Sequence, residues 1–351
     1  MTYKLPNLLP GVLIVLAIAG VAHFSGGDPQ QLLAQVFGQS NGAGQGRGAE
    51  PVAATRSDAS TIDGNQLVAQ AARRVQAEPS VQAQIRFRID VAGQNLLGNG
   101  VYVQLGDGPE KLLRFDLKLQ VAQRTAALQQ ISGQQYYWIR RDLPPANHKV
   151  SRVNLRSIRQ AIAKKHAASD KDSDLSGVGL ASPADDAWLL LGGLPALLEA
   201  LHRDFEFGPA RAGEIEFPAA ENSRASRLPV WAVSGTWKPE RWAALTAVSA
   251  KNKKVPPPTL PQRVNLVLGR NERSFALFPY RVIYYARHDQ GRAGEGGAAE
   301  AGDLTPLVTM EFFNVQPAAE LDPRDFDYNP GEQEVEDLTQ AYLVKLGLVT
   351  K

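Results

Sequence analysis

A strict alternation of apolar and polar residues over Val81–Val91 constrains the fold of this chain more than any other feature. The apolar members of the alternation are Val81, Ala83, Ile85, Phe87, Ile89 and Val91. Because successive side chains of a strand point to opposite faces, this pattern predicts a strand with one buried and one solvated face. Similar patterns follow over Gly98–Leu105, Lys111–Leu119, 124–131 and 134–141. Five successive strands joined by short turns predict an antiparallel meander.

Helical patterns interrupt the strands at a few places. We predict helices from Ser60 or Thr61 to Gln76, over 153–168, from Pro195 to about His202, and over 238–250 and 334–346. Further strands are predicted over 205–207, 230–237, 263–268, 280–287 and 306–315. Since strands and helices do not alternate regularly, a parallel sheet is disfavoured. We therefore predict an α+β fold, with one strongly curved antiparallel sheet (an incomplete β-barrel) and helices that cover its concave face.

The N-terminus predicts a membrane segment followed by a tether. Lys4 precedes an uncharged apolar run from Leu8 to Phe24, close to the lower end of the about 17–25 residues that span a bilayer. We expect residues 1–24 to be a retained signal anchor; the alternative is a signal peptide cleaved near Ala22. Residues 25–59 are rich in Gly, Ala, Gln and Ser, which predicts a disordered linker. The folded domain is predicted over residues 60–351.

Composition excludes several classes of function. Lys and Arg total 38 and Asp and Glu total 36, so the formal charge of +2 gives no basis for binding nucleic acid. The chain has no cysteine, which excludes disulfides, thiolate metal sites, cysteine nucleophiles and a lipoprotein anchored through cysteine.

No pattern in the sequence predicts a catalytic or metal site. The five histidines are scattered singly. Gly38–Gly42 matches a nucleophile elbow but lies in the predicted linker, and residues 170–181 begin like a calcium loop without its glycine and its final glutamate. Lys251, Lys253 and Lys254 form a basic run, which is either a solvated loop or a contact with anionic lipid headgroups. We expect a non-enzymatic protein without cofactor or metal.

Aromatic residues on both faces of predicted strands favour an apolar function. Tyr136–Trp138, Tyr284–Tyr285 and Phe312–Phe313 place rings on both sides of a strand. Either both faces are covered, or one face lines a pocket for an apolar ligand. The apolar segment 188–201 is either a core helix or a movable lid.

The order of these elements resembles the bacterial outer-membrane lipoprotein carrier superfamily (LolA/LolB-like). The resemblance runs from about Thr61 to Leu348 and is carried by a few segments. They are the first helix before QAQIRFRIDV (82–91), the segment LLLGGLPALLEAL (189–201), the strand LVTMEFFNVQP (307–317) and the ending FDYNPGEQEVEDLTQAYLVKLGL (326–348).

The resemblance implies an apolar cavity for acyl chains beneath a helical lid. The implied cavity residues are Ile85, Phe87, Ile89, Val101, Val103, Leu113, Phe115 and Leu117. The implied lid residues are Leu190, Leu191, Leu194, Leu197 and Leu198. The implied partner is a lipid or a lipid-anchored cargo, and the implied location is the periplasmic side of the bacterial cell envelope, anchored in the inner membrane by residues 8–24.

The chain departs from that family in its apolar N-terminal segment, its long tether and its lack of cysteine. We therefore expect a lipid-like apolar ligand rather than lipoprotein trafficking as such. The alternative is a scaffolding envelope protein whose sheet is packed by its own helices without a ligand cavity. A third hypothesis is an enzyme whose site residues converge only in the folded chain.

Overall fold

The structure is a computed structural model that describes most of the chain beyond the predicted linker. The described ranges are 62–91, 94–121, 124–143, 147–168, 187–217, 226–243, 261–271, 275–287 and 304–349. The predicted membrane segment and linker lie outside these ranges, and so do Gly38–Gly42, residues 170–181 and the basic run 251–254. No helix within the described ranges is long and apolar enough to cross a membrane.

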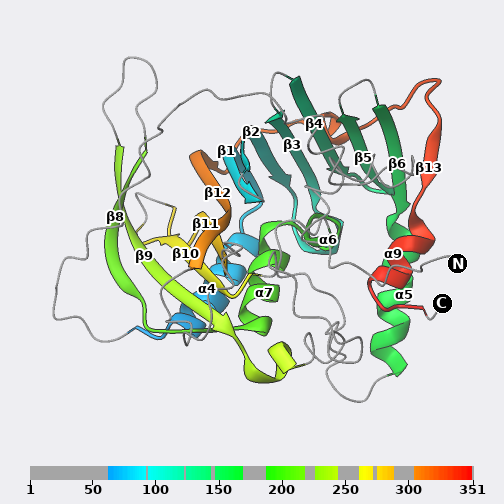
Figure 1. The fold of residues 1–351 in the computed structure, drawn as a ribbon. Helices are drawn as coiled ribbons and strands as arrows, with labels where there is room; N and C mark the ends of the chain where they lie inside the picture. Colours follow the sequence, from blue (N-terminus) through cyan, green and yellow to red (C-terminus); the bar gives the residue numbers. More distant parts are fainter. Residues whose placement is uncertain are drawn as a thin grey trace, which may run out of the picture. The chain divides into compact units, whose positions relative to one another are not determined.

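Strands outnumber helices in the described ranges (Figure 1). The strands are β1 (Ser80–Val91), β2 (Gln94–Leu105), β3 (Leu112–Val121), β4 (Arg124–Ser132), β5 (Tyr136–Leu143), β6 (Asn147–Asn154), β7 (Phe205–Phe207), β8 (Arg211–Phe217), β9 (Ser226–Trp237), β10 (Arg263–Gly269), β11 (Pro279–Arg287), β12 (Leu304–Pro317) and β13 (Val335–Asp337). The helices are α4 (Gly64–Gln76), α5 (Leu155–Ala168), α6 (Ala187–Leu190), α7 (Leu194–Asp204) and α9 (Thr339–Lys345), with short 3₁₀ turns η2 (Gly108–Glu110) and η4 (Pro323–Phe326). The predicted α+β class is confirmed.

The chain divides into two compact units. Unit 1 comprises Met1–Ala71, Arg88–Asn95 and His202–Glu311, and unit 2 comprises Ala72–Phe87, Leu96–Leu201 and Phe312–Lys351. The elements α4, β1, β2, α7 and β12 contribute residues to both units.

Unit 2 contains the predicted meander. Its strands lie in the order β13-β6-β5-β4-β3-β2-β1, with antiparallel pairing from β2 to β6 and a parallel pair between β13 and β6. The antiparallel meander is confirmed, and it also contains β6, whose last two residues were predicted to be helical. Val153 pairs with Tyr137, and the helix begins only after Asn154, whose side-chain oxygen accepts a hydrogen bond from the backbone N–H of Ser157 at 3.0 Å.

Unit 1 holds the antiparallel strands β12-β11-β10-β9-β7, and β8 also pairs with β9. The predicted strands 205–207, 230–237, 263–268, 280–287 and 306–315 all fall within these strands. The sequence pattern did not predict β8, the green strand that pairs with β9 in Figure 1.

Two predicted helix boundaries are wrong because local hydrogen bonds set other ends. Helix α4 begins at Gly64, and the Asp63 carboxylate accepts from the backbone N–H of Asn65 at 2.8 Å. The predicted helix 334–346 is the short strand β13 followed by α9. There the Asp337 carboxylate accepts from the backbone N–H of Thr339 at 3.0 Å.

Candidate functional site

The buried face of the unit 2 strands carries most of the residues that were predicted to line a cavity. Ile85, Phe87, Leu113, Phe115 and Leu117 are each at most 3% exposed. Ile89 is equally buried but belongs to unit 1. The alternation in β1 and β3 therefore predicted the buried side of both strands.

The predicted orientation of β2 is wrong. Val101 and Val103 are only partly buried, whereas Tyr102 and Gln104 are 0% exposed. The register places Tyr102 opposite Phe115, and residues opposite one another in an antiparallel pair share a face. Val101 and Val103 thus lie on the other face of the sheet.

Two physical reasons explain why β2 buries the face opposite to the predicted one. Gly98 precedes Tyr102 on the buried face, and a Cβ at Gly98 would lie 2.5 Å from Leu119 Cδ2, so the face has no room for a side chain there. Tyr102 and Gln104 can be buried because their polar atoms are hydrogen-bonded. We name the residues Ile85, Phe87, Tyr102, Gln104, Leu113, Phe115 and Leu117 the covered face.

A short helical segment packs on the covered face. All four residues of α6 are buried, and Trp188 is 2% exposed. The Trp188 ring stacks on Tyr102, with centroids 6.3 Å apart, and meets Phe115 edge-on at 5.9 Å. We name residues 187–198 the cover, since they include α6 and the beginning of α7.

The predicted lid residues all lie in the cover. Leu194, Leu197 and Leu198 are 0% exposed and Leu190 is 7% exposed, whereas Leu191 is only partly buried. Their role as a lid stays a prediction. Trp188, the residue of the cover with ring contacts to the covered face, was not among the predicted lid residues.

Two glycines join α6 to α7. Gly192 has φ +127° and Gly193 has φ +77°, both in the region that favours glycine. A Cβ at Gly193 would lie 2.9 Å from Leu113 Cδ2 and would also collide with the Tyr102 hydroxyl. The cover can therefore approach the covered face this closely only with glycine at position 193.

A chain of buried hydrogen bonds connects the start of α7 to the end of α4. The backbone N–H of Leu194 donates to Tyr102 Oη at 3.1 Å, and Tyr102 Oη donates to Gln104 Oε1 at 3.0 Å. Gln104 Nε2 donates to the carbonyl oxygens of Val75 and Glu78, both at 3.2 Å. Burial raises the pKa of Tyr102 well above its ordinary value, so the hydroxyl keeps its proton.

Lys111 adds a second tie to the end of α4. Its ammonium donates to the carbonyl oxygen of Gln76 at 3.2 Å, and the residue is 3% exposed. Burial lowers the pKa of Lys111 to about 8, against the opposing effects of Asp107 and Glu78. Two buried side chains, Gln104 and Lys111, thus satisfy carbonyls at the C-terminal end of this helix.

The aromatic residues of β5 are covered on both faces. Tyr137 is buried on one side, while on the other Trp138 contacts the Tyr328 ring at 5.3 Å and the Arg152 guanidinium lies over Tyr136 at 4.9 Å. For this strand the paired aromatic residues reflect packing on both faces.

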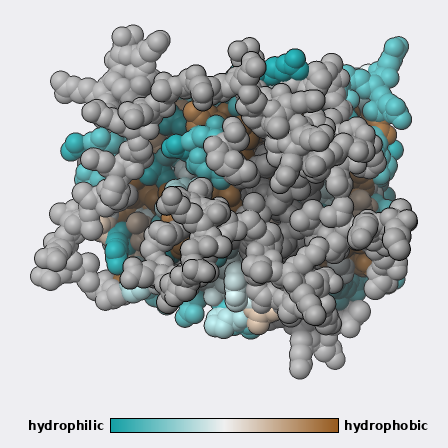
Figure 2. All heavy atoms as spheres, in the orientation of Figure 1, coloured by the Kyte–Doolittle hydropathy of each residue, from teal (hydrophilic) through white to brown (hydrophobic). Residues whose placement is uncertain are grey.

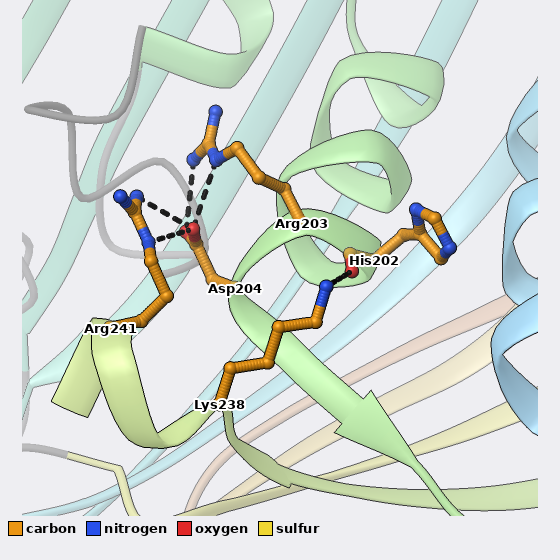
Figure 3. A network of polar contacts seen from close by, with 5 residues as sticks. All are labelled: His202, Arg203, Asp204, Lys238 and Arg241. Carbon is orange, nitrogen blue, oxygen red and sulfur yellow. Dashed lines mark hydrogen bonds and ion pairs between the residues drawn. The ribbon is translucent and has the colours of Figure 1, made fainter. Parts of the chain in front are cut away.

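A separate polar cluster lies in unit 1, around Asp204 (Figure 3). Asp204 is 1% exposed, and its carboxylate accepts from Arg203 Nε and Nη2, both at 2.9 Å, and from Arg241 Nε at 2.8 Å. Figure 3 shows both guanidinium groups directed at this carboxylate, while Lys238 Nζ donates to the His202 carbonyl oxygen at 3.0 Å. The cluster connects the end of α7 to the helical residues 239–243 that follow β9, which is a structural role.

Figure 2 shows the hydropathy of the described residues on one face of the molecule. Where described residues are visible there, brown hydrophobic side chains lie in patches between teal hydrophilic ones. Among the large hydrophobic side chains of the described residues, that of Leu97 is exposed, at 55%. Within those ranges, no group of three or more His, Asp or Glu side chains could hold a metal ion.

Comparisons with known proteins give only distant similarities. No protein-family description matches the chain, and no curated protein matches it. A solved DUF1329 family protein from Desulfovibrio piger is 14% identical, with a TM-score of 0.30 and coverage of 76% of this chain and 98% of that one. A putative outer membrane lipoprotein-sorting protein domain from Vibrio parahaemolyticus is 11% identical, with a TM-score of 0.30 and coverage of 75% and 96%. Similarity at this level assigns the chain to no family.

Proposed function

We propose that this chain is a non-enzymatic protein of the bacterial cell envelope that binds a lipid-like apolar ligand on the covered face, in place of the cover. The ligand would displace residues 187–198 and occupy the space beside Tyr102 and Phe115. The predicted anchor at residues 8–24 would hold the protein at the inner membrane, on the periplasmic side, with residues 25–59 as its tether.

The observation that carries this proposal is the contact of Trp188 with the covered face. A large aromatic side chain on a four-residue helix fills the apolar space between Tyr102 and Phe115. Four residues form a single helical turn, which has little stability of its own and depends on its tertiary contacts. A bound acyl chain can replace such contacts, because each buried CH₂ contributes about 0.8 kcal/mol.

The conformation of the glycine pair supports a cover that can move. Gly192 and Gly193 permit a wider range of backbone angles than other residues, so the link between α6 and α7 is a natural place for a change of direction.

The second candidate is a scaffold whose sheet is filled permanently by its own helices. The low exposure of Trp188 and of the buried leucines of the cover favours this reading, since a complete core needs no ligand. The two candidates differ in one respect: only the first requires the cover to leave the sheet.

Photo-crosslinking of the full chain separates these candidates. The probe is a C16 fatty alcohol with a diazirine near the end of its chain, delivered from phosphatidylcholine vesicles, and mass spectrometry maps the attachment sites. The proposal requires crosslinks on β1 to β3 at the covered face. Crosslinks confined to residues 8–24 would contradict it and favour the scaffold.

The variant Trp188→Ala provides a second measurement of binding at the covered face. Removing the indole weakens the cover and leaves space beside Phe115, so the crosslinks on the covered face should increase. The control variant Trp231→Ala alters a tryptophan of unit 1 and should leave the yield in unit 2 unchanged.

A further inference from the structure

The hydrogen bonds of Tyr102 and Gln104 run in one direction, and that direction is fixed by their partners. Gln104 Nε2 faces the carbonyl oxygens of Val75 and Glu78. Carbonyl oxygens can only accept, so the amide must place its NH₂ group toward them and its oxygen toward Tyr102. The orientation of the Gln104 amide is therefore determined.

The position of the Tyr102 proton follows from this. Gln104 Oε1 lies 3.0 Å from Tyr102 Oη and carries no hydrogen, so the tyrosine must donate to it. The hydroxyl has only one proton, and its oxygen is then left to accept. In the closed structure it accepts from the backbone N–H of Leu194 at 3.1 Å.

Displacement of the cover withdraws that donor. Leu194 belongs to the cover, whereas Tyr102 and Gln104 belong to the covered face. With the cover displaced, the apolar face presents one unsatisfied oxygen, and that oxygen can only accept. Reversing the hydroxyl to donate would leave Gln104 Oε1 unpaired, at a cost of about 1–3 kcal/mol for a buried group.

We infer that the covered face selects amphiphiles that carry a hydrogen-bond donor, an O–H or an N–H, beside the alkyl chain. Fatty alcohols, acylglycerols with a free hydroxyl and N-acyl amides belong to this class. Alkyl ethers and full esters, which offer only acceptors, would leave the Tyr102 oxygen unpaired. This inference rests on the proposed function and names the ligand class for the same site.

The experiment compares two ligands that differ in one hydrogen-bond donor. Unlabelled 1-dodecanol and dodecyl methyl ether compete against the diazirine fatty alcohol for the covered face of the full chain. The wild-type chain should favour the alcohol. This preference should fall at least about fivefold in Tyr102→Phe/Gln104→Met, which removes both acceptor oxygens, and this fall corresponds to a net hydrogen bond of about 1 kcal/mol. Tyr102→Phe alone leaves Gln104 Oε1 free to accept from the alcohol, so it should retain part of the preference. Comparing the ratio between variants cancels the different solubilities of the two ligands.

One control variant completes the test. Tyr284→Phe removes a buried hydroxyl in unit 1 that has no hydrogen-bond partner among the described residues, and it should keep the wild-type ratio. An unchanged ratio in the double variant would overturn the inference while crosslinking still supports the proposed function. Absence of crosslinks at the covered face in every variant would overturn both.

Discussion

The hydroxyl of Tyr102 and the amide of Gln104 lie 3.0 Å apart, and both side chains are 0% exposed. Together they connect the start of α7 to the end of α4 through hydrogen bonds that leave no polar atom of either side chain unpaired. A polar chain of this kind inside an apolar face gives the cover one defined position, because every alternative position breaks a buried hydrogen bond.

Tyr102→Phe should destabilise the protein. The change keeps the ring but leaves the Leu194 N–H and Gln104 Oε1 without partners, and an unsatisfied buried group costs roughly 1–3 kcal/mol. Urea unfolding measures the difference. Tyr284→Phe is the matched control, since the Tyr284 hydroxyl has no hydrogen-bond partner among the described residues, and its loss should cost little. Equal losses for the two variants would contradict the role given to the Tyr102 hydroxyl.

Gly193→Ala should be more damaging than Gly331→Ala. Both glycines have positive φ, +77° and +60°, so both substitutions carry a backbone penalty of roughly 1–2 kcal/mol. Only Gly193 also faces Leu113 and Tyr102, whereas a Cβ at Gly331 would meet nothing within 4 Å. The difference between the melting temperatures of the two variants therefore measures the steric effect of the Cβ at position 193. A melting temperature for Gly193→Ala equal to that of Gly331→Ala would show that the cover does not press on the covered face.

Lys111→Met should change how stability depends on pH. The pKa of Lys111 is lowered in the folded chain to about 8, compared with 10.5 as its ordinary value. Between these values the unfolded chain keeps a proton that the folded chain has released. The free energy of unfolding contributed by Lys111 therefore rises with pH across this window and is constant below it.

The difference between wild type and Lys111→Met isolates this effect from other groups that titrate at high pH. Denaturant unfolding is measured at pH 7, 8, 9 and 10. Above pH 8 the free energy of unfolding of wild type should rise relative to that of the variant, by roughly 1–3 kcal/mol across the window. A difference that stays flat from pH 7 to pH 10 would mean that the Lys111 amine is not buried.

Asp204→Asn should destabilise unit 1. It leaves Arg203 and Arg241 without the buried carboxylate that both contact, and breaking a buried ion pair costs roughly 3–5 kcal/mol. Glu216→Gln is the control, because the Arg227–Glu216 pair is solvent-exposed, with side chains 70% and 56% exposed, and such pairs contribute about 0–1 kcal/mol. A loss of unfolding free energy in Asp204→Asn that is no larger than the loss in Glu216→Gln, measured by chemical denaturation, would contradict the structural role of the cluster.

The sequence predicted the parts of the fold that depend on local periodicity. Strands β1 and β3 have a regular alternation, so the buried positions of Phe87 and Phe115 followed directly. The prediction for β2 was wrong because the buried face of this strand combines Gly98 and Gly100 with Tyr102 and Gln104. A rule that places apolar residues inside cannot recognise a polar pair that is satisfied by hydrogen bonds from distant residues.

The same limit applies to the candidate site. The apolar segment 188–201 was predicted as a core helix or a lid, but nothing local indicates that Trp188 meets Tyr102 and Phe115, since those contacts depend on tertiary packing. The two glycines of β2, spaced by two residues and followed by Tyr102 and Gln104 in the same phase, were the available signal for the true orientation. Asp204 and Arg241 are separated in the sequence by the strands β7, β8 and β9, so their contact was not predictable from spacing.

Hydrogen–deuterium exchange of the full chain, with and without 1-dodecanol, tests the central claim most directly. If the ligand takes the place of the cover, backbone amides of residues 187–198 should exchange faster when the ligand is bound, while those of β3 should stay protected. If 1-dodecanol competes with the diazirine probe for the covered face while the exchange of residues 187–198 stays unchanged or slows, displacement of the cover is contradicted.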